Sequence, residues 1–434
     1  MKRHSRMLGA AATFAVAALA LTACSGGESG SSGSSADGGK VTMELWHNST
    51  TGDGKAFWDN TAADFMKANP NVTINIQAVQ NEDLDGKLQT AMNSGDAPEI
   101  FFSRGGGKLN DMIAADQVQD ITDLVTDETK KAIGEGALAS LTVDGKLYGV
   151  PTSVLPGGIY YSEELFKQAG IDTPPTTMAE LNDAVAKLKA AGIQPIALGA
   201  KDAWPAAHWF YFFALRECSQ DIFTTSSAKG DFSDACWVKA AEDLKTFADT
   251  EPFNSGFLTT SAQQGAGSSA GLVANHKAAM ELMGAWDVGV IADLTPEKKP
   301  LADLRWFPFP AVDGGKGGEG ALMGGLDGFS CSKDAPKECA EFLNFAAQKE
   351  YQEKYAEAFK TIPANMDAQG VVTEPALKDI LQANNKAPYI AVWLDTLLGQ
   401  NVGNALNIGV VDMLAGKTGP DGILKAVESA AAKG

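Results

Sequence analysis

The sequence predicts an α/β fold with two lobes, and the distribution of apolar residues carries this prediction. Val41, Met43 and Leu45 alternate with polar residues, apolar residues then recur at helical spacing over 57–66, and alternation returns over 72–78. This order of strand, helix and strand is typical of a parallel α/β layer. A similar α/β pattern begins again after residue 148, which indicates a second lobe.

The elements of the first lobe follow one another closely. We expect the first helix to end at Asn69-Pro70, because the residue before a proline is disfavoured in a helix. Another helix is expected around 84–92, and the apolar run Ile100-Phe101-Phe102 predicts a buried strand.

After an apolar segment at 148–151, the second lobe is expected to open with another at 159–161. A helix over 162–170 follows, and Thr177 with Glu180 matches a capping box that starts a helix ending at Gly192. The later elements that we expect are a strand over 196–198 and predominantly helical stretches over 204–213 and 232–286.

Length and composition bound the class of protein. A chain of 434 residues has room for roughly two to four domains. Its residues are 44% apolar and 21% charged, which is typical of a globular protein. The formal net charge of -19 disfavours a surface that neutralises nucleic-acid phosphates, so we expect no nucleic-acid partner.

The first 40 residues have a different composition. Lys2, Arg3 and Arg6 precede an uncharged, mostly apolar stretch over 7–21, which is typical of a signal peptide. Leu21-Thr22-Ala23-Cys24 resembles the bacterial lipobox, in which the cysteine is lipidated and becomes the first mature residue. Several buried acyl chains give stable anchoring, so Cys24 is expected to hold the protein on the outer face of the cell membrane. The Ser/Gly-rich segment that follows, 25–40, is expected to be a flexible tether.

The chain has five cysteines, and four remain if Cys24 is lipidated. An even number in an exported chain favours disulfides, although sequence alone leaves their connectivity open. We favour the local pairing of Cys218 with Cys236 and Cys331 with Cys339; four buried free thiols are the alternative. No C-x-x-C or C-x-x-H spacing supports a zinc site.

Motifs for catalysis and for cofactors are weak. Gly267–Gly271 matches G-x-S-x-G, but polar residues stand where a buried strand should precede the serine. Leu109 follows Lys108 where a P-loop needs Ser or Thr. His47, His208 and His276 lack the i,i+4 spacing of metal ligands. We therefore expect no catalytic residues, no metal and no cofactor.

Several short motifs in order resemble one family over essentially the whole chain from Cys24 onward. The family is the family 1 extracellular solute-binding proteins, the substrate receptors of sugar-importing ABC transporters. The motifs are the lipobox, the tether, Leu45-Trp46-His47-Asn48, Ala97-Pro98-Glu99-Ile100-Phe101-Phe102, Tyr148-Gly149-Val150-Pro151, Tyr160-Tyr161-Ser162-Glu163-Glu164-Leu165-Phe166 and Met283-Gly284-Ala285-Trp286. High Ala and Gly content suggests an actinobacterial source, and within the family the chain looks most similar to receptors for xylobiose and related oligosaccharides.

The resemblance implies a periplasmic-binding-protein-like fold, with two α/β lobes and a hinged cleft between them. Mapped onto this chain, lobe 1 would comprise 41–153 and 319–364, and lobe 2 would comprise 154–318 and 365–434. The crossings near Thr152, Gly320 and Asn365 are the expected hinge.

A sugar receptor needs flat aromatic platforms for C–H faces and a ring of polar groups for hydroxyls. The family often places a sugar-stacking tryptophan at the position of Trp286, and Trp204 and Trp393 are further candidates. Packing in the core is the alternative for each of the three. The other tryptophans lie in apolar runs and are expected to be structural: Trp46, Trp58, Trp209, Trp237 and Trp306.

The family draws its polar ring from loops at the carboxyl ends of strands, where open α/β sheets generally bind ligands. Each such residue could equally be a solvated loop residue, so the prediction concerns the set. Its members are His47, Asn48, Thr51, Asn81, Glu82, Ser103, Arg104, Asp202, Asp287, Asp327 and Asn365.

The expected function is that of a monomeric, lipid-anchored, non-enzymatic receptor that passes a short oligosaccharide to the permease subunits of an ABC importer. A secreted glycoside hydrolase acting on the same sugars is the alternative, because sequence alone cannot exclude a catalytic pair of carboxylates. A surface scaffold that binds another protein is the third class.

Overall fold

One mixed β-sheet joins strands from distant parts of the chain. The computed structural model describes residues 39–433, of which Lys40 onward form one compact unit. The expected signal peptide, Cys24 and nearly all of the tether lie outside the described residues. No helix within 39–433 combines the length and apolar character required to cross a bilayer.

The sheet has the strand order β2-β1-β3-β10-β6-β8-β7, while β9 and β11 pair with β6 and β12 pairs with β10. The strands β4 and β5 form a separate hairpin. The strand bounds are β1 Val41–His47, β2 Val72–Ala78, β3 Ile100–Ser103, β4 Thr142–Val143, β5 Lys146–Leu147, β6 Gly149–Ser162, β7 Gln194–Ala197, β8 Ala278–Gly284, β9 Leu304–Phe307, β10 Leu322–Cys331, β11 Ile362–Pro363 and β12 Ile390–Val392.

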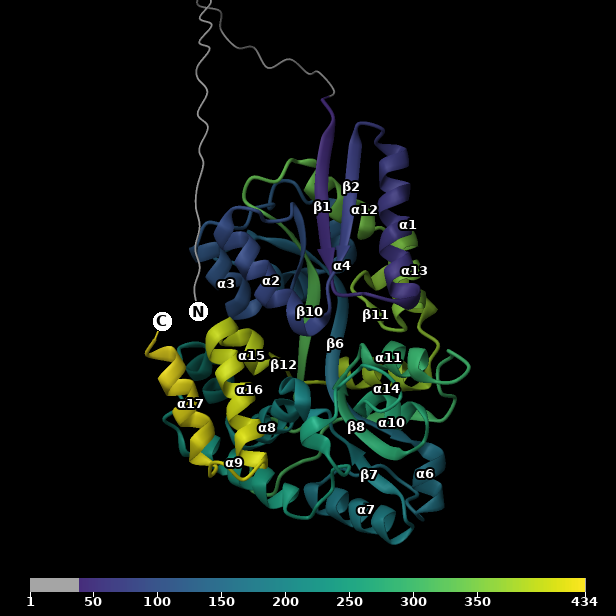
Figure 1. Ribbon diagram of the computed structural model, residues 1–434, viewed down its shortest axis with the longest axis vertical. Helices are drawn as coiled ribbons and strands as arrows, with labels where there is room; N and C mark the ends of the chain where they lie inside the picture. The colour runs from purple at the N-terminus through teal and green to yellow at the C-terminus, as the bar shows by residue number, and fades with distance from the viewer. Residues whose placement is uncertain (1–38, 434) are drawn as a thin grey trace, which may run out of the picture. The chain divides into compact units, whose positions relative to one another are not determined.

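Helices cover the sheet, and Figure 1 shows α15, α16 and α17 together along one side of its lower part. The helix bounds are α1 Gly52–Ala68, α2 Asn81–Ser94, α3 Gly106–Ala114, α4 Asp127–Ile133, α5 Glu135–Leu138, α6 Glu163–Gln168, α7 Met178–Ala190, α8 Trp204–Glu217, α9 Ala235–Ala248, α10 Ser269–Ala274, α11 Asp287–Leu294, α12 Glu338–Ala346, α13 Lys349–Phe359, α14 Pro375–Asn384, α15 Leu394–Leu397, α16 Gln400–Leu414 and α17 Asp421–Ala431.

The first strands and helices follow the sequence pattern closely. β1 pairs in parallel with β2 from Val41↔Val72 to His47↔Ala78, and its Met43 and Leu45 are buried, as their alternation predicts. The buried face of α1 carries Phe57, Trp58, Ala62 and Phe65. The capping box of α7 is also confirmed, because Thr177 and Glu180 exchange side-chain to backbone hydrogen bonds.

β6 is one continuous strand where the sequence predicts two separate apolar segments. It contains Pro151 and Pro156, pairs with β10 over its first part and with β8 and β9 over its second part. Figure 1 shows β6 and β10 running from the upper into the lower part of the sheet. The pairing of β6 with β10 is irregular at Asp327/Gly328, where Thr152 donates a hydrogen bond to the carbonyl of Asp327.

One expectation about the segment 232–286 is wrong. Its last part, Ala278–Gly284, is strand β8, between β6 and β7. Alanine, methionine, leucine and glutamate dominate this stretch, and all four favour a helix in isolation. Its neighbours in the sheet override that preference, since all seven residues are buried.

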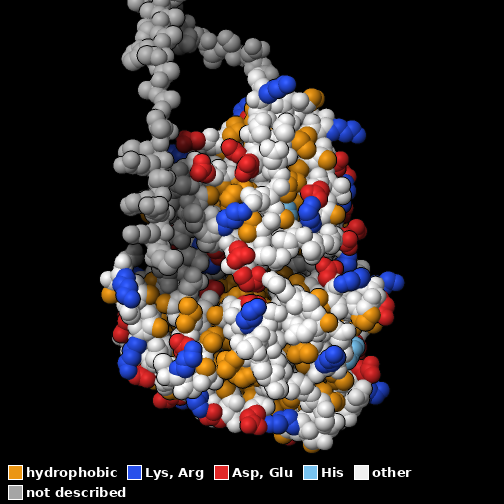
Figure 2. Space-filling view, in the orientation of Figure 1, with side chains coloured by type: hydrophobic (Ala, Val, Ile, Leu, Met, Phe, Trp, Pro, Cys, Tyr) orange, Lys and Arg blue, Asp and Glu red, His pale blue; other side chains and the backbone are white. Residues whose placement is uncertain are grey.

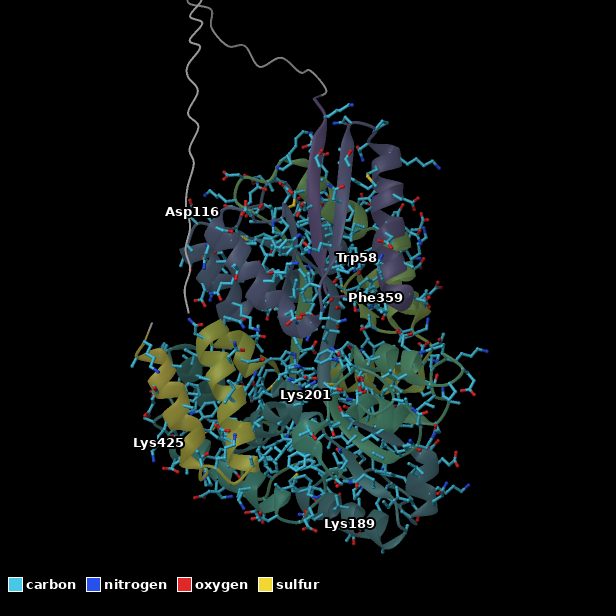
Figure 3. All side chains as sticks on the ribbon, viewed as in Figure 1. Trp58, Asp116, Lys189, Lys201, Phe359 and Lys425 are labelled. Atoms are coloured by element: carbon cyan, nitrogen blue, oxygen red, sulfur yellow. A yellow bond between two sulfur atoms is a disulfide. The ribbon has the colours of Figure 1, made fainter. Side chains whose placement is uncertain are left out.

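Three apolar clusters form the core. Val150 of β6 belongs to one with Trp58 and Phe329, Leu155 to a second and Ile159 to a third. Figure 3 labels Trp58 and Phe359, whose ring centroids are 6.5 Å apart, in the upper part. The tryptophans expected to be structural are all buried: Trp46, Trp58, Trp209, Trp237 and Trp306.

Two disulfides tie local segments together. Cys218 is bonded to Cys236 and Cys331 to Cys339, which is the local pairing that the sequence analysis favours. On the surface, Figure 2 shows acidic and basic side chains interspersed over the visible face.

Candidate functional site

Three tryptophans chosen from the sequence converge around a histidine. Trp204 begins α8 and His208 lies one turn later, Trp286 lies between β8 and α11, and Trp393 lies between β12 and α15. We call these four residues the aromatic cluster. The imidazole of His208 stacks on Trp393 with a centroid distance of 4.2 Å. Trp286 lies 5.9 Å from Trp393 and 6.1 Å from Trp204, edge to face in both cases.

Glycines make room for these rings. A Cβ on Gly157 of β6 would lie 2.4 Å from the Trp393 ring, and one on Gly325 of β10 would lie 3.0 Å from it. A Cβ on Gly284 would lie 2.0 Å from Trp286. The absence of a side chain at Gly284 therefore leaves room for the indole of Trp286.

The aromatic cluster is only partly covered. His208 and Trp393 are buried, whereas Trp204 and Trp286 are half-buried. Within residues 39–433, the indole N–H of Trp204 and Nδ1 of His208 have no hydrogen-bond partner. Burial lowers the pKa of His208 to about 4, although the negative charge of Asp395 acts to raise it. This ring is therefore neutral at pH 7. The cluster offers apolar faces with neutral polar edges.

A polar cluster centres on Arg104, directly after β3. Its guanidinium donates to Asp85 at 3.2 Å and to Asn81 at 2.7 Å, and lies 4.0 Å from Asp327. Lys108 donates to the other oxygen of Asp85 at 2.8 Å. We call Asn81, Asp85, Arg104, Lys108 and Asp327 the polar cluster.

The two carboxyl groups of the polar cluster are paired unequally with its two cations, Arg104 and Lys108. Burial opposes ionisation of Asp85, but Arg104 and Lys108 outweigh it and hold the pKa of Asp85 well below its usual range. Burial raises the pKa of Asp327 to about 6, despite the nearby Arg104. Asp327 therefore ends up the less strongly paired carboxyl, with capacity to accept a hydrogen bond from a hydroxyl.

The aromatic and polar clusters adjoin each other. Gly325, against the Trp393 ring, and Asp327 are two apart on β10 and point to the same face of that strand. The negative charge of Asp395 also favours the protonated forms of both Arg104 and His208, and so acts to raise the pKa of each. Side chains from both parts of the sheet therefore meet around Trp393.

Some predicted residues lie at the polar cluster or beside it. Asn48 donates to the side-chain oxygen of Asn81 at 3.3 Å. Thr51 is exposed at the N-terminus of α1, and the carboxylate of exposed Glu82 accepts a hydrogen bond from Gln264 at 3.3 Å. Ser103 is buried next to Arg104, and its hydroxyl has no partner among residues 39–433.

Other predicted residues are committed to internal contacts. Buried His47 accepts a hydrogen bond from the Ser49 N–H, and burial lowers its pKa to about 4. Asp202 accepts from the Ala262 N–H at 2.8 Å. The side chain of Asn365 accepts from the Asp367 N–H and donates to the Ala347 carbonyl. Asp287 is also buried, but neither of its carboxyl oxygens has a hydrogen-bond partner among residues 39–433, and burial raises its pKa.

Sequence reasoning missed four contributors: Asp85, Lys108, His208 and Asp395. Asp85 and Lys108 lie on helices α2 and α3 rather than in strand-end loops, and His208 lies within a strongly apolar helix. A signal existed for His208 and for Asp85, since they follow Trp204 and Asn81 at the i,i+4 spacing that brings helical side chains together.

The G-x-S-x-G motif has no catalytic setting. Ser268 caps α10, and buried Ser269 donates its hydroxyl hydrogen to the Ala262 carbonyl. Glu164, His276 and Asp303 form a group that could hold a metal ion. These residues come from distant segments, so the search for i,i+4 spacing in the sequence does not find them.

Comparisons with known proteins agree with this architecture. The family model for bacterial extracellular solute-binding proteins matches residues 48–353. An uncharacterised ABC transporter extracellular-binding protein of Pyrococcus horikoshii is 27% identical, over 78% of this chain and 75% of that protein. The multiple sugar-binding protein of Streptococcus mutans is 25% identical, over 73% of each.

A solved structure from a study of xylan utilization by Caldanaerobius polysaccharolyticus superimposes with a TM-score of 0.82. It is 25% identical and covers 90% of this chain and 99% of that chain. The two-domain α/β fold expected from the sequence is thus confirmed. Because the family model spans well over half of the residues, the chain belongs to the bacterial extracellular solute-binding proteins, a family of binding proteins rather than of glycoside hydrolases.

Proposed function

We propose that this protein is the lipid-anchored receptor of an ABC importer and that it binds a short oligosaccharide, xylobiose or a similar sugar. The observation that carries the proposal is the aromatic cluster beside the polar cluster. Indole faces match the C–H faces of pyranose rings, while carboxylates, amides and a guanidinium match hydroxyl groups.

The relatives support this class of ligand. The Streptococcus mutans protein is a multiple sugar-binding protein, the Pyrococcus horikoshii protein is an ABC transporter extracellular-binding protein, and the superimposed structure comes from work on xylan utilization. A xylose unit carries no exocyclic hydroxymethyl group, so its flat C–H faces suit stacking on an indole face such as that of half-buried Trp286.

The proposed ligand site comprises Trp204, Trp286 and Trp393 as platforms, with His208, Asn81, Arg104 and Asp327 as polar groups. The sugar would bind between the two proposed lobes and contact both. Lobe 1 would comprise 41–153 and 319–364, and lobe 2 would comprise 154–318 and 365–434. A ligand that contacts both lobes only when they are closed stabilises the closed state, which the permease would recognise. Cys24 would carry the lipid anchor, and the receptor would act as a monomer.

Thermal-shift screening of the mature protein against xylobiose, cellobiose, maltose and chitobiose tests the ligand class. A receptor gains stability with the bound sugar, since ligand binding to the folded state raises the melting temperature. Chromatography of the same samples should return the sugar unchanged. Cleaved sugar would instead identify a hydrolase, and no response to any sugar would point to a protein-binding scaffold.

Metabolic labelling with a radioactive fatty acid tests the anchor separately. The wild-type chain should incorporate label and sediment with membranes. Cys24→Ala should be unlabelled, and label retained in that variant would contradict anchoring at Cys24.

A further inference from the structure

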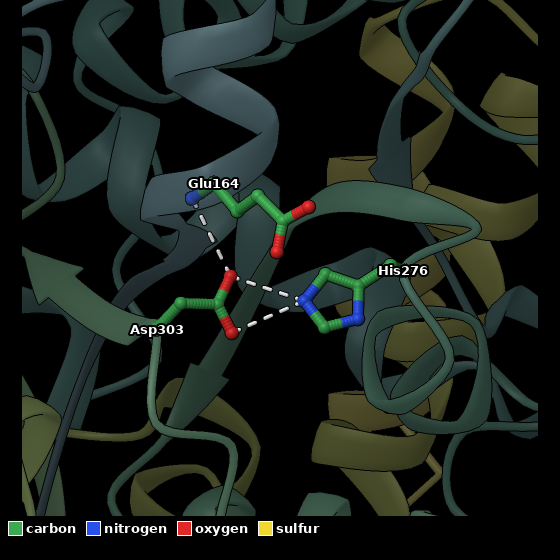
Figure 4. A group of neighbouring side chains, drawn as sticks. All are labelled: Glu164, His276 and Asp303. Atoms are coloured by element: carbon green, nitrogen blue, oxygen red, sulfur yellow. Dashed lines mark hydrogen bonds and ion pairs between the residues drawn. The ribbon is translucent and has the colours of Figure 1, made fainter.

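Three side chains able to ligate a metal converge away from the aromatic cluster. Ligand atoms of Glu164, His276 and Asp303 all lie within 4.8 Å of one another. Figure 4 shows them approaching from three separate segments: Glu164 lies in α6, His276 between α10 and β8, and Asp303 directly before β9.

The histidine and the aspartate have the spacing of adjacent ligands. Nε2 of His276 lies 3.0 Å from one oxygen of Asp303 and 3.1 Å from the other. Two donor atoms bound to one zinc ion at its usual bond lengths stand about 3 to 3.5 Å apart. A metal ion can therefore replace the proton between these groups with little movement of either side chain.

Asp303 is already held in place. Its carboxylate accepts a hydrogen bond from the Ser162 hydroxyl and another, at 3.4 Å, from the Glu164 N–H. Hydrogen bonds of this kind orient carboxylate ligands in metal sites.

The backbone also fixes His276. This residue stands two positions after the end of α10 and has a left-handed backbone conformation, with a φ of 51°. Its N–H donates to the Val273 carbonyl, and the Lys277 N–H donates to the Leu272 carbonyl. Its ring remains 32% exposed and the Asp303 side chain 22% exposed, so solvent water has access to the group.

We propose that Glu164, His276 and Asp303 form a binding site for a divalent transition-metal ion of the zinc class, with water completing the coordination. One imidazole with two carboxylates suits zinc, whereas Ca²⁺ and Mg²⁺ prefer oxygen ligands alone. The four described cysteines are in disulfides and offer no competing thiolate.

This site is separate from the proposed sugar site. Ser162, which orients Asp303, and Gly157, which contacts Trp393, stand about 17 Å apart along β6. Binding of a metal ion would tie α6, the α10–β8 turn and the start of β9 together. The expected effect is higher thermal stability, with sugar affinity unchanged.

Isothermal titration of the detergent-solubilised mature protein with ZnCl₂ tests the proposal, with MgCl₂ as the comparison cation. One Zn²⁺ per chain should bind, and His276→Gln and Glu164→Gln should each weaken binding at least tenfold. Ser162→Ala should weaken it roughly 10-fold to 100-fold, as loss of an orienting hydrogen bond does. Circular dichroism verifies that each variant is folded.

Glu163→Gln is the matched control, because Glu163 faces Arg305 at 3.6 Å instead of the proposed ligands. This variant should bind Zn²⁺ as the wild type does. Equal loss in Glu163→Gln and Glu164→Gln, undiminished binding in folded His276→Gln, or no Zn²⁺ uptake by the wild type would each overturn the proposal. If His276→Gln does not fold, Asp303→Asn takes its place in the same comparison.

A second readout is the visible spectrum of Co²⁺ bound in place of Zn²⁺. Absorption bands in the wild type should be lost in folded Glu164→Gln and retained in Glu163→Gln. Bands that persist in Glu164→Gln would place the metal at other residues and contradict the proposal.

Discussion

His208 stacks on Trp393 with ring planes inclined by only 18°, although the two residues are distant in sequence. His208 comes from α8, and Trp393 comes from the turn that follows β12. The stack fixes the orientation of the buried Trp393 indole, whereas Trp286 is half-buried and therefore partly accessible. The first prediction therefore concerns Trp286.

Trp286→Ala should weaken sugar binding by about 1 to 3 kcal/mol, because a stacking platform is lost. Trp286→Phe keeps an aromatic face and should retain most of the affinity. Calorimetric titration with the sugar that gives the largest thermal shift measures both. Wild-type affinity in a folded Trp286→Ala protein would remove this residue from the site.

Arg104→Ala should reduce stability by roughly 3 kcal/mol and abolish measurable sugar binding. Without the guanidinium, Asp85 and Asp327 remain as neighbouring acidic groups. Lys108 is then the one cation of the polar cluster left to balance their charge. Urea unfolding and calorimetry provide the two measurements. Lys55→Ala is the control, since its exposed pair with Asp59 should contribute less than about 1 kcal/mol. Equal effects of the two substitutions would contradict the assigned role.

Gly157→Ala should displace Trp393 and lower both stability and sugar affinity. The new Cβ would lie 2.4 Å from that indole and 3.1 Å from Phe212, so overpacking should cost about 1 to 3 kcal/mol. Gly86→Ala is the matched control in α2, where a Cβ meets nothing within 4 Å. It should stabilise the protein by about 0.5 to 1 kcal/mol. Chemical denaturation shows whether each substitution raises or lowers the free energy of unfolding. An unchanged free energy of unfolding in Gly157→Ala would show that Trp393 can shift freely.

Stability should fall on acidification in a way that depends partly on His208. The pKa of His208 is about 4 in the folded protein, below the ordinary histidine value of 6.5, so the unfolded state binds more protons between these pH values. Between pH 7 and pH 5 the wild type should lose about 2 kcal/mol more than His208→Gln. Denaturation at both pH values measures this, and identical losses would show that His208 is protonated when folded.

Local patterns predicted the strands and caps well because each depends on neighbours in sequence. Val41, Met43 and Leu45 alternate, and Thr177 with Glu180 forms the capping box, as expected. β8 was missed because its helix-favouring residues become a strand only through β6 and β7.

From the sequence, the family resemblance pointed to Trp286, with Trp204 and Trp393 as further candidates, and the structure brings all three together. Asp85 and Asp395 could not be found in this way, since their roles depend on Arg104 and His208 across the fold. Asn365 and Asp202 show the converse: polar loop residues whose hydrogen-bonding capacity is used internally.

The continuity of β6 bears on how the molecule unfolds. This one strand contributes to all three apolar clusters, through Val150, Leu155 and Ile159. None of the clusters can therefore unfold without breaking part of the pairing of β6 with its neighbouring strands. Amides of β6 should therefore exchange with deuterium only through global opening, and heat should produce a single cooperative transition.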